Sequence, residues 1–365
     1  MCGIAGFIDY KQGFDSAAIL GGMAKALNHR GPDGEGVWFD DSVGIGLAHT
    51  RLSILDLSSA GSQPMMSKSG RFVMVFNGEI YNHKIIRGEI EASCQVKWVG
   101  SSDTETLLAA IDLWGLEITL EKIIGMFAVA VWDLRAKTLS LVRDRAGEKP
   151  LYYGWVGNSF IFGSELSVFK SIPGFANAIN RDALALYLKY SSIPAPYSIY
   201  QDVLKLEPGV AITLDACGKQ IHRLEYWSFH KAFHQGINNR YSGNPGDVVA
   251  DLTNILSKAV LSQMEADVPL GAFLSGGVDS SVIVSLMQSQ SSQQVKTFSI
   301  GFENEAFNEA EYAKAVACHL GTDHHDMYVT GHDALSVIPH LASIYDEPFA
   351  DSSQIPTYLV SKIAK

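Results

Sequence analysis

The chain has few cysteines, no cluster of basic residues and no long apolar run, and each absence excludes a class of protein. Its four cysteines are scattered through 365 residues without a Cys-x-x-Cys spacing, which argues against a disulfide framework or a zinc site. The net charge of −11, without a Lys/Arg run, argues against nucleic acid or an anionic membrane as the main partner. No stretch has the length of a transmembrane helix and no signal peptide is present, so we expect a cytoplasmic protein.

What the chain has is an apolar content of 47%, enough for packed cores, and a length that suggests two domains. Its first part is rich in short strands, with helices expected at 17–27 and 103–114, the second preceded by the capping-box pattern Ser102 to Glu105. A hairpin-like pair is expected near 203–227, turning at 217–219. Other strands are expected at 3–8, 44–49, 71–76, 126–133, 138–143, 151–156 and 159–163. Two sheets with helices outside them suit this order.

After residue 247 the pattern changes to alternating helices and strands, which indicates a parallel α/β sheet. Helices are expected at 247–264, 280–290 and 309–320, and strands at 269–274, 296–302 and 325–329. The polar, turn-rich segment 228–247 is interpreted as a linker, so the domains are predicted at 2–227 and 248–365. A doubly wound sheet usually has about five or six strands. We therefore expect the second domain to be incomplete at its C-terminus.

The second residue, Cys2, carries the first chemical signal. Met1 before a residue as small as cysteine is usually trimmed, and trimming would leave a thiol and a free α-amine on one residue. The two groups have ordinary pKa values of about 8 to 8.5, so the amine can serve as the base for the thiol. The alternative is an incidental cysteine near a terminus.

A glycine-rich turn between a strand and a helix carries the second signal. The apolar stretch 268–274 is followed by Ser275-Gly-Gly-Val-Asp-Ser-Ser281 and then by an apolar helix. Backbone N–H groups at such a helix start bind phosphate, and Asp279 suits a Mg²⁺ between the carboxylate and the phosphates. The alternative is an ordinary turn in which Asp279 and Ser280 cap the helix. No GxxxxGK[ST] sequence is present, which excludes a Walker-type site.

Together these blocks resemble the glutamine-dependent asparagine synthetases, which join a class II amidotransferase domain to a PP-loop ATP pyrophosphatase domain. The likeness extends from residue 2 to the last residue. It rests on the PP-loop and on the blocks at 2–6, 29–34, 49–54, 76–82, 102–105 and 144–152. The resemblance implies an N-terminal-nucleophile αββα sandwich followed by a partial parallel α/β domain.

The resemblance implies a catalytic role for three residues of the first domain. Cys2 would attack the side-chain amide of glutamine, and its α-amine would move the proton. Asn77 and Gly78 would form the oxyanion hole, through the side-chain amide and the backbone N–H. The alternative for Asn-Gly after a strand is a hairpin turn.

Three further residues would bind the rest of glutamine. Arg51 would hold the α-carboxylate, which suits a planar bidentate donor, although a surface salt bridge is the ordinary role of arginine. Asp103 would bind the α-ammonium, although acids are favoured in the first turn of any helix. Glu79 would line the same pocket.

In the second domain the resemblance implies a site for ATP and Mg²⁺. Leu274 and Ile300 would bracket the adenine, unless they are ordinary core residues, and Asp351 is a candidate metal or substrate contact beside Asp279. The sequence His324-His-Asp326 resembles a metal site but is interpreted as a strand edge with polar side chains. The triphosphate and Mg²⁺ would be bound by Ser275, Gly276, Gly277, Asp279, Ser280 and Ser281.

The implied reaction is the ATP-dependent amidation of a carboxylate, most simply aspartate to asparagine, with glutamine as the nitrogen donor. A sugar or another carboxylate is the alternative acceptor, and a glutaminase alone is the alternative if the short chain is the whole product. A non-catalytic sensor would not need Cys2. Relatives often pair as dimers, so a homodimer is the candidate assembly.

Overall fold

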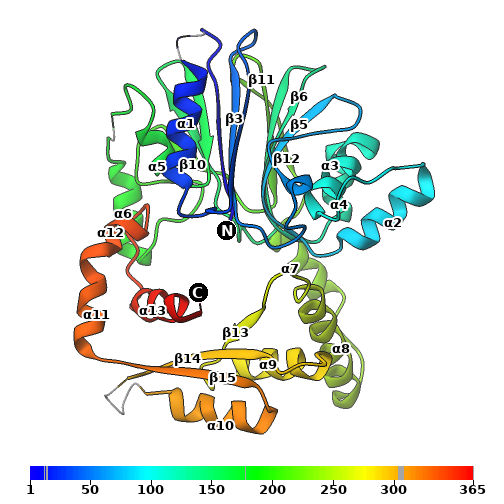
Figure 1. Ribbon diagram of the computed structural model, residues 1–365, viewed down its shortest axis with the longest axis vertical. Coiled ribbons are helices and arrows are strands. Elements are labelled where there is room, and N and C mark those ends of the chain that lie inside the picture. Colours follow the sequence, from blue (N-terminus) through cyan, green and yellow to red (C-terminus); the bar gives the residue numbers. More distant parts are fainter. Residues whose placement is uncertain (12, 14, 177, 303–307, 365) are drawn as a thin grey trace. The chain divides into compact units, whose positions relative to one another are not determined.

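The computed structural model describes residues 1–11, 13, 15–176, 178–302 and 308–364 (Figure 1). The chain forms two compact units, and each is described by itself. The first comprises Met1–Arg240 and Asp346–Pro348, and the second comprises Tyr241–Tyr345 and Phe349–Lys365.

The first unit is built on two six-stranded antiparallel sheets. One has the order β10-β8-β9-β1-β3-β2 and the other β12-β11-β7-β6-β5-β4. The strands of the first sheet are β1 Gly3–Ile8, β2 Gly34–Asp40, β3 Ile45–Arg51, β8 Tyr152–Val156, β9 Ser159–Gly163 and β10 Val203–Lys205. Those of the second are β4 Met65–Met66, β5 Phe72–Ile80, β6 Gly125–Asp133, β7 Thr138–Arg143, β11 Val210–Asp215 and β12 Gln220–Glu225.

Helices cover the outer faces of both sheets (Figure 1). The first sheet is covered by α1 Ser16–Leu27, α5 Ser167–Lys170 and α6 Arg181–Tyr190, and the second by α2 His83–Ser93, α3 Asp103–Trp114 and α4 Leu116–Lys122. A short 3-10 turn, Ser59–Gly61, precedes β4. The expected αββα sandwich is therefore confirmed.

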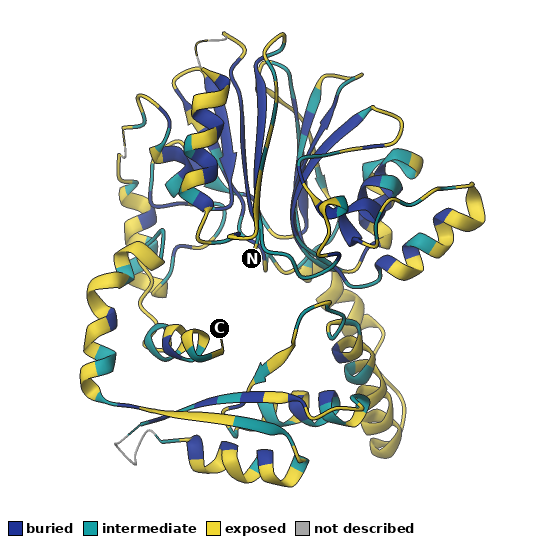
Figure 2. Ribbon diagram, viewed as in Figure 1, coloured by how far each residue is buried: buried dark blue, intermediate teal, exposed yellow. Residues whose placement is uncertain are grey.

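Central strands such as β1 and β6 are buried on both faces, which explains their nearly continuous apolar sequences, whereas β2 and β12 at the sheet edges are largely exposed (Figure 2). In β1, Ile4 and Ile8 pack between the sheets, whereas Ala5 and Phe7 pack under the outer helices. In β5, Val73 and Val75 face the other sheet while Phe72, Met74 and Phe76 face the helices. This alternation sets the direction of every side chain further along β5.

Some local expectations differ from the structure. The segment 228–247, interpreted as a linker from its polar, turn-rich composition, contains helix α7, Phe229–Asn238, and the start of α8, Pro245–Ser262. Phe229, Phe233 and Ile237 recur at helical spacing, which favours a helix, whereas the turn-forming residues around them favour a linker. The predicted pair near 203–227 is the hairpin β11–β12, whereas β10 pairs with β8 in the other sheet.

The short segment Asp346–Pro348, which follows much of the second unit in the sequence, belongs to the first unit. The Glu347 carboxylate pairs with Lys205 and accepts the Ile199 N–H at 2.8 Å, and Asp346 accepts the Leu166 N–H at 2.7 Å. Burial raises the pKa of Asp346 to about 6.

The second unit contains a parallel sheet, as expected, with the order β13-β14-β15. Its strands are β13 Gly271–Phe273, β14 Lys296–Phe302 and β15 Asp323–Val329, so His324–Asp326 lie on an edge strand as predicted. The remaining helices are α9 Val278–Gln290, α10 Ala310–Leu320, α11 Gly331–Val337, η3 Ile338–His340, α12 Leu341–Ile344 and α13 Gln354–Ala364. Across the described part of the chain, no helix combines the length and apolar character that crossing a bilayer requires.

The packing between the two sheets predicts a measurable stability difference. Leu47 on β3 is fully buried there, so Leu47→Ala is expected to lower the free energy of unfolding by about 2–5 kcal/mol. Val37 on the neighbouring strand is 44% exposed, and Val37→Ala is expected to cost less than about 1 kcal/mol. Urea unfolding of both variants measures this, and equal losses would contradict the assignment of the core.

Candidate functional site

Cys2 lies at the start of β1, beside the segment that follows β3. Its Sγ contacts the Leu52 carbonyl oxygen at 3.6 Å and accepts the Leu52 N–H at 3.4 Å. Burial raises the pKa of the thiol. Met1 precedes it, is 55% exposed, and donates from its terminal amine to the Arg30 carbonyl oxygen at 3.1 Å. With Met1 attached, the thiol is therefore neutral and has no free amine on its own residue.

Strand β5 runs past the end of its short neighbour β4, which pairs only with Val73 and Met74. Alternate residues of an antiparallel strand direct their N–H groups to the same edge. At this edge the Phe76 N–H donates to Gln63 Oε1 at 2.6 Å, and the Ile80 N–H donates to Asp103 Oδ2 at 2.9 Å. Gly78 lies between them, so its N–H is directed to the same open edge.

Asn77 extends from β5 to the side that faces the other sheet, by the alternation that places Val73 and Val75 there. It is 1% exposed, and its Nδ2 is buried without a hydrogen-bond partner among the described residues. An orphaned buried donor costs about 1–3 kcal/mol, so such a group indicates a ligand. The strand continues through Asn77 and Gly78 to Ile80, which excludes the alternative of a hairpin turn.

His49 holds the strand on which these donors lie. Its Nε2–H donates to the Phe76 carbonyl oxygen at 3.2 Å, which links β3 of one sheet to β5 of the other. Burial lowers the pKa of His49 to about 4, so the imidazole is neutral at physiological pH.

Arg51 ends β3 and is folded onto the segment that follows it. Its Nη1 donates to the Ser58 carbonyl oxygen at 2.7 Å, and its Nη2 donates to the carbonyl oxygens of Leu55 and Asp56. A guanidinium has five N–H donors, and these three bonds leave two. No carboxylate pairs with Arg51 among the described residues, so the alternative of a surface salt bridge is not observed.

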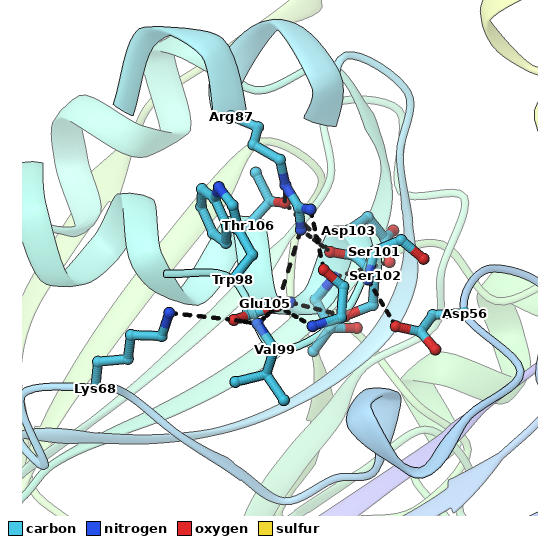
Figure 3. A network of polar contacts seen from close by, with 12 residues as sticks. Asp56, Lys68, Arg87, Trp98, Val99, Ser101, Ser102, Asp103, Glu105 and Thr106 are labelled. Atoms are coloured by element: carbon cyan, nitrogen blue, oxygen red, sulfur yellow. Dashed lines mark hydrogen bonds and ion pairs between the residues drawn. The ribbon is translucent and has the colours of Figure 1, made fainter. Parts of the chain in front are cut away.

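Asp103 lies in the first turn of α3, within a network of polar contacts (Figure 3). It accepts the Ile80 N–H and the Thr104 N–H, the second at 2.8 Å. Burial raises the pKa of Asp103 to about 7, with a further contribution from the charge of Glu79. Burial likewise raises the pKa of Glu79, against the opposing effect of Lys149. The two carboxyl groups therefore favour their neutral forms more than free carboxyl groups do.

The capping box expected at α3 is half formed. Ser102 Oγ accepts the Glu105 N–H at 3.2 Å, as predicted. The Glu105 carboxylate does not reach back to the Ser102 N–H; it accepts the N–H groups of Val99 and Gly100, both at 2.9 Å (Figure 3). The difference arises because the preceding loop folds over the start of the helix. The backbone N–H groups of that loop need acceptors, and the Glu105 carboxylate provides them.

The six residues singled out in the first domain line one cavity of about 150 Å³: Cys2, Arg51, Asn77, Gly78, Glu79 and Asp103. Sequence reasoning missed three polar residues of the lining, Gln63, Thr104 and Lys149. Lys149 lies within the quoted block 144–152, so a signal existed for it. Gln63 precedes a proline in a polar loop, and nothing in the sequence marked it. The cavity is smaller than drug-sized sites and suits a small metabolite.

In the second unit, Leu274, Ser275 and Ile300 line a larger and mainly apolar cavity of about 820 Å³. The turn after β13 depends on Gly276, whose φ is +79° and where a Cβ would lie 2.6 Å from the Ala313 nitrogen. Ser280 Oγ and Ser275 Oγ lie 3.0 Å apart, and Ser281 Oγ is buried without a described partner.

Asp279 and Asp351 are not among the residues that line this cavity. Asp279 lies in the first turn of α9, and Asp351 Oδ1 accepts the Ser353 N–H at 2.8 Å. Within the described ranges no group of three or more His, Cys, Asp or Glu residues could hold a metal. Gly277 is the N-cap of α9 and provides no side-chain cap. The start of this helix therefore has backbone N–H groups available for an anion.

Comparisons with known proteins agree with the two units. Residues 1–227 match the family described as a glutamine amidotransferase domain, and residues 251–365 match the family described as asparagine synthase. A Methanocaldococcus jannaschii protein named as an asparagine synthetase [glutamine-hydrolyzing] is 37% identical over 100% of this chain and 72% of its own length. Asparagine synthetase [glutamine-hydrolyzing] 1 of Bacillus subtilis is 34% identical over 100% of this chain and 56% of its own length.

The chain thus spans about half to three quarters of the length of these relatives. Among solved structures, glutamine phosphoribosylpyrophosphate amidotransferase from B. subtilis is similar with a TM-score of 0.47 and 14% identity, covering 90% of this chain and 66% of that chain.

The surroundings of Cys2 predict slow alkylation while Met1 is attached. Burial raises the pKa of its thiol and limits access, whereas Cys217 is exposed. Iodoacetamide is therefore expected to label Cys217 faster than Cys2 at about pH 8, as measured by mass spectrometry of peptides from Met1-bearing protein. Faster labelling of Cys2 would contradict the geometry of its surroundings.

Proposed function

Because the chain belongs to the family of glutamine-hydrolysing asparagine synthetases, we propose that it transfers the amide nitrogen of glutamine to a carboxylate, with aspartate as the acceptor, at the expense of ATP. The boundaries we propose are 2–227 for the glutaminase domain and 248–365 for the synthetase domain, with 228–247 connecting them. The observation that carries the proposal is the unpaired Asn77 amide in the cavity that Cys2, Arg51 and Asp103 also line.

The cavity offers a separate partner for each polar part of glutamine. The two free N–H groups of Arg51 suit the α-carboxylate. The Asp103 carboxyl, uncompensated and buried, suits the α-ammonium, with Glu79 beside it. Asn77 Nδ2 and the Gly78 N–H suit the oxygen of the side-chain amide, which becomes negatively charged when the amide is attacked.

The chemistry proceeds through a thioester. Removal of Met1 gives Cys2 an α-amine, which accepts the thiol proton as Sγ bonds to the amide carbon. The proton then moves to the leaving nitrogen, the C–N bond breaks and ammonia departs. Water attacks the thioester carbon, the C–S bond breaks, and glutamate leaves as the thiol regains its proton.

The second unit would bind ATP. The acceptor carboxylate would bond to the α-phosphate and displace pyrophosphate, and ammonia would then bond to the acyl carbon of this adenylate, lose a proton and displace AMP. Leu274 and Ile300 would hold the adenine, and Ser275, Ser280, Ser281 and the backbone of 276–277 would hold the phosphates. Mg²⁺ would neutralise phosphate charge, with Asp279 and Asp351 as its candidate carboxylate ligands.

Replacement of the nucleophile tests both halves of the proposal. Cys2→Ala removes the thioester route, so ammonia release from glutamine is expected to fall by about 10³-fold or more, while ATP cleavage supported by added ammonia continues. A coupled glutamate assay and a pyrophosphate assay measure the two activities, with Cys217→Ala as the control. Retained glutamine hydrolysis, or equal loss of both activities, would refute the two-site scheme.

The raised pKa of Asp103 predicts a pH dependence. Its carboxyl has a pKa of about 7, and only the ionised form binds an ammonium, so protons compete with glutamine below that pH. The kcat/KM for glutamine is expected to fall roughly tenfold per pH unit below about pH 7, while kcat changes less because bound ammonium keeps the carboxyl ionised. Steady-state kinetics from about pH 5 to 8 measure this, and a flat kcat/KM below pH 7 would contradict the role of Asp103.

A further inference from the structure

Asp56 is a buried carboxylate outside the lining of the glutaminase cavity. It belongs to the segment 52–63 that follows Arg51, which we term the clamp loop. Its side chain is 7% exposed, and its backbone has the unusual φ of +55°. A non-glycine residue at positive φ is held there by its surroundings. In Asp56 these surroundings are two groups of hydrogen bonds made by its carboxylate.

One group of contacts lies within the clamp loop and determines where Arg51 is held. Asp56 Oδ1 accepts the Ser58 N–H at 3.1 Å and the Ser58 hydroxyl at 2.5 Å. This closes a turn that orients the carbonyl groups of Asp56 and Ser58. Both carbonyl oxygens accept hydrogen bonds from the Arg51 guanidinium. The carboxylate of Asp56 therefore orients two of the three acceptors that hold Arg51.

The other contact leaves the loop and reaches the start of α3 (Figure 3). Asp56 Oδ2 accepts the Ser101 N–H at 2.7 Å, and Ser101 is followed by the N-cap Ser102 and then by Asp103. Burial disfavours ionisation of Asp56, but the hydrogen bonds from Ser58 and Ser101 outweigh it and keep its pKa below the ordinary value. Asp56 is thus bonded as a carboxylate.

The close approach of the two segments depends on Gly100. A Cβ at position 100 would lie 2.2 Å from Asp56 Oδ2, closer than any real contact. On its opposite side the same segment is held by Arg87, which donates to the carbonyl oxygens of Gly100 and Ser102 at 3.0 and 3.2 Å. Gln63 Nε2 provides a second, longer link from the clamp loop to α3, at 3.4 Å from Thr104 Oγ1. Asp56 therefore makes the shorter of the two links.

We propose that Asp56 is a positioning residue that sets the distance between Arg51 and Asp103, and so the affinity of the site for both charged groups of the amino acid. The inference rests on the proposed glutaminase function. A site that must span an α-carboxylate and an α-ammonium needs its two partners at a fixed separation. One carboxylate that bonds both supporting segments provides this.

The test compares Asp56→Ala and Gly100→Ala, which break the same contact from its two sides. The contacts with the α-groups are made equally in the ground state and the transition state, so their loss raises KM and leaves kcat. Both variants are expected to raise the KM for glutamine about tenfold or more, with kcat within about threefold of the unsubstituted protein. If Asp56→Ala does not fold, Asp56→Asn replaces it and is expected to change KM in the same direction.

Asp112 offers a matched control. It also bonds a loop to α3, through Ser69, whose hydroxyl and N–H it accepts at 2.6 and 3.3 Å, but it lies near the other end of the helix. Asp112→Ala is expected to lower stability without changing KM. A KM within twofold of the unsubstituted protein in Asp56→Ala and Gly100→Ala, or the same KM change in Asp112→Ala, would overturn the inference.

Substrate analogues distinguish positioning from a general loss of structure. Glutaramate lacks the α-amine and 4-aminobutanamide lacks the α-carboxylate. If Asp56 sets the spacing of both partners, Asp56→Ala is expected to lower kcat/KM for glutamine more than for either analogue; an equal loss for all three substrates would contradict it. If the unsubstituted, Met1-trimmed protein hydrolyses no glutamine, the proposed function fails. If it does and the variants keep their KM, only the present inference fails.

Discussion

The site depends on a strand that is longer than its neighbour. β5 continues for several residues beyond the end of β4, and its N–H groups on that edge have no partner strand, although the other edge pairs with β6. Two of them are bonded by side chains, since Phe76 donates to Gln63 and Ile80 donates to Asp103, and the Gly78 N–H between them is the donor proposed for a ligand. An exposed edge is ordinarily a liability of β-sheets. Here it supplies a rigid backbone donor beside the Asn77 amide and the Cys2 thiol.

Several ionisable groups around this edge are buried, so their charged forms are disfavoured, and the charged groups of an amino acid would stabilise those forms. Burial raises the pKa of the Cys2 thiol and of the Asp103 and Glu79 carboxyls, so each resists ionisation while the cavity holds no ligand. Arg51 avoids the same cost by donating to backbone carbonyl oxygens. Under the proposed function, part of the binding energy of an α-amino acid would come from compensating groups that the fold has already desolvated.

Support for these groups comes from side chains that bond the backbone around the cavity. His49 and Gln63 bond the two backbone groups of Phe76, next to Asn77, while Asp56 and Arg87 hold the start of α3 on opposite sides. Each bond joins segments that are distant in the chain. The result is a site built on strand and helix ends, where geometry is better determined than on a free loop.

The sequence by itself determined the elements and the chemical identities. Periodicity predicted the strands buried on both faces, and α3 begins and ends at the predicted residues Asp103 and Trp114, because both signals act over a few neighbouring residues. Cys2 and the glycine-rich turn before α9 were likewise evident from residue type and order. Only the tertiary structure decided that Asn77 and Gly78 continue a strand instead of turning, that Glu105 accepts from the preceding loop, and that Asp56 joins Arg51 to α3. Ile80 and Asp103 are 23 positions apart and Asp56 and Ser101 are 45 apart, whereas Glu105 accepts from residues only five and six positions earlier. No local pattern encodes these pairings, because the acceptor for each backbone group is chosen only when the chain packs.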